Sequence, residues 1–177
     1  MRKRVEGFRP FMSLITEARS RAPHPVDVVE TIAHANDWQF DRETDDEITM
    51  NVAGGWTDYQ VSFTWLEDVE ALHISCAFDV KKHERRNGEM HNLIALINEH
   101  LWLGHFGFWK SEGMVIFRHA LVLSGGLAPS SAQCEAILNA ALAASERYYQ
   151  TFQFVLWAGK TAEEALASAM IETEGEA

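Results

Sequence analysis

Hydrophobic residues occupy every second position in four short segments of the first half of the chain. These segments are 38–41, 47–52, 59–65 and 72–80. In the third segment the polar residues Gln60, Ser62 and Thr64 fill the intervening positions. Such alternation is typical of an antiparallel sheet with one face packed on the core and the other face wet or loosely covered. The pattern predicts four strands and leaves open whether the first two form a regular pair or an irregular ribbon.

Two stretches with helical spacing flank these strands. The first carries Val28, Val29 and Ile32 after a proline that suits a first helical turn, and it ends near residue 36. The second predicts a helix over 88–103, with Gly104 placed to end it in a left-handed conformation. The apolar face of this second helix is formed by Met90, Leu93, Ile94, Ile97 and Leu101.

A hairpin and a long helix complete the pattern. The aromatic segment 102–109 leads through a tight turn at 111–113 into an apolar strand over 114–123. Ser130 and Gln133 form a capping-box pair that opens the last long helix. Apolar and small residues recur in it about every 3.5 residues, as far as position 156. This stripe fits packing across the sheet, which we favour, and it also fits a dimer interface.

The order of elements is helix, four strands, helix, two strands, helix, or α-β-β-β-β-α-β-β-α, followed by a short helix over 161–171. It predicts the α+β class, with a single antiparallel sheet flanked by helices. A chain of 177 residues is the size of one domain with a complete core. We divide it into a basic arm (1–23), a domain (24–172) and an acidic tail (173–177).

Charge is distributed unevenly along the chain. The net charge is −11, and residues 1–24 carry +4, so the remainder carries −15. An acidic body repels phosphates, which argues against binding to nucleic acid or to an anionic membrane. The basic arm fits docking on the body, on a neighbouring subunit or on a partner, and it equally fits a solubilising tail. A further alternative is nucleic-acid contact by the arm alone.

Cysteine usage and the apolar runs indicate the compartment. Cys76 and Cys134 each lie on an apolar face without a second cysteine nearby, so we expect buried, unreactive thiols. Such thiols fit a reducing cytoplasm. The apolar run 11–15 is shorter than the core of a signal peptide, and no stretch approaches about 18 apolar residues. These features predict a cytoplasmic protein without a membrane span.

The chain holds eight histidines, but none has the spacing of a metal site. His91 and His100 are nine residues apart and point in different directions on a helix. His105 and His119 approach each other across the hairpin only in some registers. No nucleophile, phosphate loop or carboxylate pair has a working context. We therefore expect no catalytic residue, metal or cofactor. The alternative is a ligand- or metal-dependent sensor or enzyme that uses His91, His105 or His119.

Aromatic residues offer the candidates for a binding surface. Most of the six tryptophans are expected in the core, but one follows a glycine pair in a loop and another ends a helix. Partly exposed aromatic side chains are enriched at protein interfaces. Local packing is the alternative for each of them. The candidate protein-binding residues are Trp56, Phe106, Phe108, Trp109 and Trp157.

Several longer runs resemble a known family. These runs are Trp56–Tyr59, His73–Asp79, Asn98–Phe106, Phe117–Leu121 and Phe152–Lys160. They are similar to the YbjN-domain family of proposed bacterial sensory transduction regulators, and in particular to its alphaproteobacterial branch. The resemblance covers about residues 24–177, so the basic arm lies mostly outside it.

The resemblance implies a fold similar to that of type III secretion chaperones, and it carries no catalytic motif with it. It also implies a small cytosolic regulator or chaperone-like adaptor that acts by protein contact. We therefore expect a non-enzymatic protein that binds an unidentified protein partner and forms a homodimer. Such proteins take extended segments on apolar patches or sheet edges.

Overall fold

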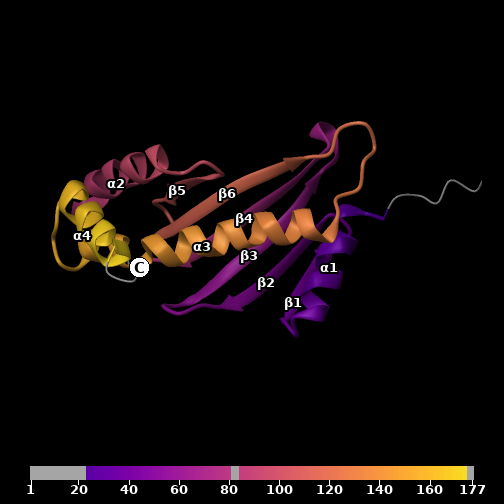
Figure 1. Ribbon diagram of the computed structural model, residues 1–177, viewed down its shortest axis with the longest axis horizontal. Coiled ribbons are helices and arrows are strands. Elements are labelled where there is room, and N and C mark those ends of the chain that lie inside the picture. Colours follow the sequence, from indigo (N-terminus) through magenta and orange to yellow (C-terminus); the bar gives the residue numbers. More distant parts are fainter. Residues whose placement is uncertain (1–22, 81–83, 175–177) are drawn as a thin grey trace, which may run out of the picture.

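The computed structural model describes residues 23–80 and 84–174 of the chain. Their six strands form one antiparallel sheet in the order β1-β2-β3-β4-β6-β5 (Figure 1). The expected α+β class and the expected order of elements are confirmed. The basic arm up to residue 22 and the last three residues of the acidic tail lie outside the described residues.

The strands are β1 (Phe40–Thr44), β2 (Glu47–Ala53), β3 (Asp58–Leu66), β4 (Ala71–Asp79), β5 (His105–Trp109) and β6 (Met114–Val122). The helices are α1 (Pro25–Ala35), α2 (Asn87–Glu99), α3 (Ser131–Leu156) and α4 (Ala162–Glu174). Short 3-10 turns, η1 (Glu67–Val69) and η2 (Glu84–Arg86), precede β4 and α2. The pairing of β1 with β2 shifts register between Asp41 and Thr44, so these two strands form the irregular ribbon that the sequence allowed.

The helices gather on one side of the sheet. Figure 1 shows α3 lying along the sheet, with α1 near its first turns and α2 and α4 near its last turns. Because side chains alternate between the two faces of a strand, only every second residue can meet these helices. Those residues are apolar and buried, among them Ile48, Met50, Val61, Phe63, Leu72, Ile74, Val115 and Phe117.

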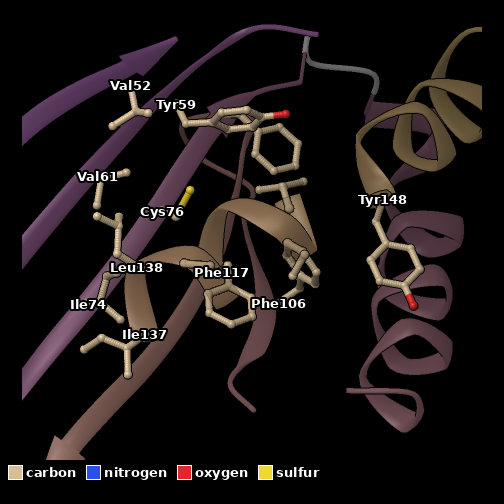
Figure 2. Close-up of a cluster of buried hydrophobic side chains, with 14 of the residues drawn as sticks. Val52, Tyr59, Val61, Ile74, Cys76, Phe106, Phe117, Ile137, Leu138 and Tyr148 are labelled. Carbon is tan, nitrogen blue, oxygen red and sulfur yellow. The ribbon is translucent and has the colours of Figure 1, made fainter. Parts of the chain in front are cut away.

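An aromatic cluster joins α3 to the hairpin of β5 and β6. The ring of Phe106 lies 5.4 Å from that of Phe117, 5.5 Å from that of Phe152 and 6.1 Å from that of Tyr148, measured between centroids. Phe152 also lies 5.8 Å from Phe78 on β4. Edge-to-face pairs at these separations add to the burial energy of the rings. Figure 2 shows Phe106 and Phe117 within this buried cluster.

Helix α3 begins and packs as its sequence predicts. The Ser130 hydroxyl accepts from the Gln133 N–H, and the Gln133 side chain accepts from the Ser130 N–H, which completes the capping box. The periodic stripe, from Cys134 to Leu156, is buried in the core cluster that the sheet also lines. The preference for packing across the sheet is therefore confirmed, and this stripe is not available as a dimer seam.

The two cysteines are buried and free. Burial raises the pKa of both thiols to about 11. Cys76 also accepts a hydrogen bond from the Ser145 hydroxyl at 3.4 Å. Both thiols therefore stay protonated near neutral pH and act as small apolar side chains, as expected.

Helix α2 ends earlier than the sequence predicts. Its last residue is Glu99 rather than Leu103, and His100 is its C-cap. Asn98 Oδ1 accepts from the Phe106 N–H at 2.8 Å, and its Nδ2 donates to the Phe106 carbonyl at 3.1 Å. Gly104 has the expected positive φ of 70°, but it lies beyond the helix end. A Cβ at Gly104 would collide with the Phe117 ring and the Arg118 carbonyl, so the glycine serves close packing on β6 instead of a helix cap.

Gly104→Ala is expected to lower the free energy of unfolding by more than about 1–2 kcal/mol, because left-handed strain adds to the collision with Phe117. Gly159→Ala is the matched control, since Gly159 has the same φ of 70° and nothing within 4 Å of its missing Cβ. Urea unfolding of both variants isolates the cost of the collision. Equal losses in the two variants would contradict this role of Gly104.

Candidate functional site

The five candidate binding residues do not form one surface. Trp56, in the turn between β2 and β3, is 54% exposed, Trp109 at the end of β5 is 47% exposed, and Trp157 at the end of α3 is 56% exposed. Phe106 is only 2% exposed and belongs to the aromatic cluster, so its side chain cannot meet a partner directly. Phe108 is half-buried on the helix side of β5. Three of the five residues therefore remain accessible.

The histidines of the alternative hypothesis are also separated. The ring of His91 on α2 packs edge-on against Phe108, with 5.8 Å between centroids. His105 lies opposite Arg118 in the register of β5 and β6, so His119, the next residue, points to the other face of the sheet. Within the described residues, no three histidine, cysteine or acidic side chains are placed to hold a metal ion.

The most distinctive surface is the side of the sheet that faces away from the helices, here called the open face. Directly opposed residues form a row of polar side chains across five strands. Cβ atoms of directly opposed residues lie about 4.5–5.5 Å apart. Two members of this row, Thr49 and Ser62, share a hydrogen bond of 2.8 Å. From β2 to β5 the row is Thr49, Ser62, Ser75, Arg118 and His105.

A hollow of about 400 Å³ lies over this row. At its β5 edge the Arg118 guanidinium reaches over the ring of Trp109, 5.2 Å from the centroid. Ile116 lies between them along the sheet and is only 2% exposed. The sheet register thus places a cation, an indole ring and a row of hydroxyl groups on one accessible surface.

His73 on β4 lines the same hollow, next to Ser75 in the strand direction. Burial lowers the pKa of His73 below its ordinary value, and the positive charges of Arg118, His105 and His119 lower it further. At neutral pH the imidazole is therefore uncharged and able both to donate and to accept a hydrogen bond.

A second hollow, of about 670 Å³, lies where α1 meets the turn regions of the sheet. Its cation, Arg42, is paired with Asp27 at 2.8 Å and also with Glu30. Burial alone would lower the pKa of Arg42, but the hydrogen bonds to these carboxylates raise it. Glu70 in the same hollow accepts the N–H groups of Gly125 and Gly126. Because these polar groups bind one another, this hollow has fewer polar groups available to a ligand than the open face has.

The sequence predicted that one side of the sheet is polar, but it did not single out Arg118 on that side. The alternation of Gln60, Ser62 and Thr64 predicts a polar side of the sheet. Arg118 is the sole charged residue inside the apolar strand 114–122, and that was a usable signal. His73 and Ser75 lie beside Arg118 because β4 pairs with β6, and strand patterns alone do not reveal that pairing.

Helices on one face of an antiparallel sheet, with a polar and accessible second face, define a protein of the α+β class. The sequence profile of the YbjN family, described as "putative bacterial sensory transduction regulator", matches residues 25–154. The chain therefore belongs to the YbjN family. No curated protein sequence matches it significantly.

Two solved structures are similar to the chain. The crystal structure of YbjN, described as a putative transcription regulator from E. coli, is 8% identical, with 87% of this chain and 93% of that chain covered and a TM-score of 0.48. A chain in the crystal structure of the ExsC–ExsE complex is 14% identical, with 70% and 90% covered and a TM-score of 0.44. At these scores neither likeness supports an inference about function. Among the described residues, no helix is both long and apolar enough to cross a membrane.

His73→Gln is expected to weaken the pH dependence of stability. Because the pKa of His73 is lowered in the folded state, the unfolded chain binds the proton more readily, and the free energy of unfolding falls as the pH drops below about 6.5. Above that range His73 contributes no pH dependence. Urea unfolding at pH 7.5 and pH 5.5 should show a smaller loss for His73→Gln than for the wild type. Equal losses would contradict the lowered pKa.

Proposed function

We propose that the chain is a non-enzymatic, chaperone-like adaptor or regulator that acts in the cytoplasm by binding another protein. The family description supports a regulatory role. The observation that carries the binding proposal is the open face, a sheet surface that displays exposed apolar side chains at both ends. We further propose that the chain belongs to the alphaproteobacterial branch of the family, as the runs of similar sequence suggest.

At one end of the open face, Leu66 is 42% exposed and Val122 is 66% exposed. Both are neighbours of Ala71, which pairs with Leu66 on β3 and with Val122 on β6. At the other end Trp109, 47% exposed, lies opposite Met114. Apolar side chains that remain exposed beside polar ones are typical of binding surfaces, because their burial drives association and the polar groups set the register.

A homodimer is part of this proposal. The stripe of α3, which the sequence offered for self-association, is buried in its own core. The outer edge of β5, which ends the sheet, is the surface that remains for a second copy. Sedimentation velocity of the full-length chain is the direct measurement of this state.

Trp109→Ala is expected to reduce partner capture at least fivefold without unfolding the protein, because it removes an exposed aromatic ring from one end of the open face. The measurement is affinity capture of tagged full-length protein from its native cytosol, quantified by mass spectrometry. Thermal unfolding of the variant establishes that the fold is kept.

Trp102→Ala is the matched control, since Trp102 is fully exposed but lies in the connection before β5 and outside the candidate set. One stoichiometric partner that is lost with Trp109→Ala and kept with Trp102→Ala supports the proposal. Unchanged capture by the Trp109 variant, or no partner other than the chain itself, would overturn it.

A further inference from the structure

We infer that the Arg118–Trp109 corner of the open face is a recognition site for a carboxylate, presented by an acidic residue two positions from an apolar residue in an extended segment of a partner protein. This inference deepens the proposed function and rests on it. It assigns the charge, the conformation and the side-chain chemistry of the segment that the open face would take.

The first observation is that Arg118 has no counter-ion among residues 23–80 and 84–174. The described residues contain ion pairs of His24, His34 and Arg42, but no carboxylate of the described chain lies within 4.0 Å of the Arg118 guanidinium. Arg118 is nevertheless half-buried and held against the Trp109 ring. A stacked guanidinium keeps its hydrogen-bond donors at its edge, where they match the two oxygens of a carboxylate.

The second observation is the set of groups around this cation. Ser75 lies directly opposite Arg118 on β4, and His105 lies directly opposite it on β5. His73 lies one diagonal step away, opposite Ala120. A hydroxyl and two imidazoles can donate to the remaining lone pairs of a carboxylate, which a bound anion needs in a partly desolvated hollow.

The third observation is the apolar surface beside the cation. Trp109, Met114 and Ile116 line the same hollow as Arg118. Met114 lies two strand positions before Ile116, on the same face of the sheet as Arg118. The residue two positions from a bound acid in an extended segment points to the same side as the acid, so an apolar side chain there would add burial to the charge interaction.

The fourth observation is the charge gradient of the hollow. Glu43 and Glu47 line its far side, on β1 and β2. Three strand spacings separate β2 from β6, or about 14 Å at about 4.8 Å each. The acids at one side would repel a uniformly negative ligand such as a nucleic acid, whereas a protein segment can place its acid on the Arg118 side alone. The net charge of −15 on the chain beyond residue 24 would also repel a nucleic acid.

An array of random-sequence octapeptides, probed with full-length protein, tests the inference. Wild-type protein is expected to favour peptides with Asp or Glu two positions from an apolar residue at least fivefold over the array average. Replacement of that acid by Asn or Gln should weaken binding at least tenfold, measured by fluorescence polarisation with unaltered protein. Arg118→Gln should remove the acidic preference, and Arg118→Lys should restore part of it, because a lysine keeps the charge but lacks the planar fork.

Each other outcome overturns the carboxylate site. Selection of peptides without a preference for acidic residues would do so. So would an acidic preference that Arg118→Gln leaves unchanged, or an array on which the protein binds no peptide. A 12-nucleotide single-stranded DNA that displaces the best peptide with equal affinity would show that the Arg118–Trp109 corner binds phosphate instead. If the array fails while Trp109-dependent partner capture persists, the protein-binding proposal stands alone. If both fail, the proposed function fails as well.

Discussion

The ring of Phe106 is the contact on which the rest of the molecule depends. It meets Phe117 from its own hairpin and Phe152 and Tyr148 from α3, so one side chain links the β5–β6 hairpin to α3. Loss of a buried phenylalanine costs about 3–5 kcal/mol, a large part of the about 5–15 kcal/mol that stabilises a typical domain. The same contact sets the faces of the hairpin. With Phe106 and Phe117 turned towards α3, their neighbours His105 and Arg118 must turn outwards.

Local periodicity was enough to predict most of the fold. The capping pair at Ser130 and Gln133 and the alternation in β3 and β4 act within a few residues, and both appear in the structure as the sequence predicts. The end of α2 was misplaced, and near that end the chain makes contacts that lie outside the helix. Asn98 binds the backbone of Phe106, and no pattern within the helix signals that bond.

The candidate site was less predictable, and the reason is physical. Exposure of an aromatic residue depends on which face of a strand it occupies, so the adjacent residues Phe108 and Trp109 have different environments although both are aromatic. The open face combines residues from strands far apart in sequence, such as Ser62, Ser75 and Arg118. Their proximity follows from the sheet order, in which the β5–β6 hairpin returns to pair with β4 after α2.

The two hydrogen bonds of Asn98 also affect how the sheet can grow. Phe106 directs its N–H and carbonyl away from β6, towards the outer edge of β5, where an incoming strand would need them. Asn98 already occupies both groups, with a side-chain amide that stands in for the peptide group of a further strand. Continuous strand addition across β5 is therefore blocked at this residue, which protects a sheet edge from uncontrolled polymerisation. A second copy at this edge has to associate through side chains, and the open face stays clear for a different occupant.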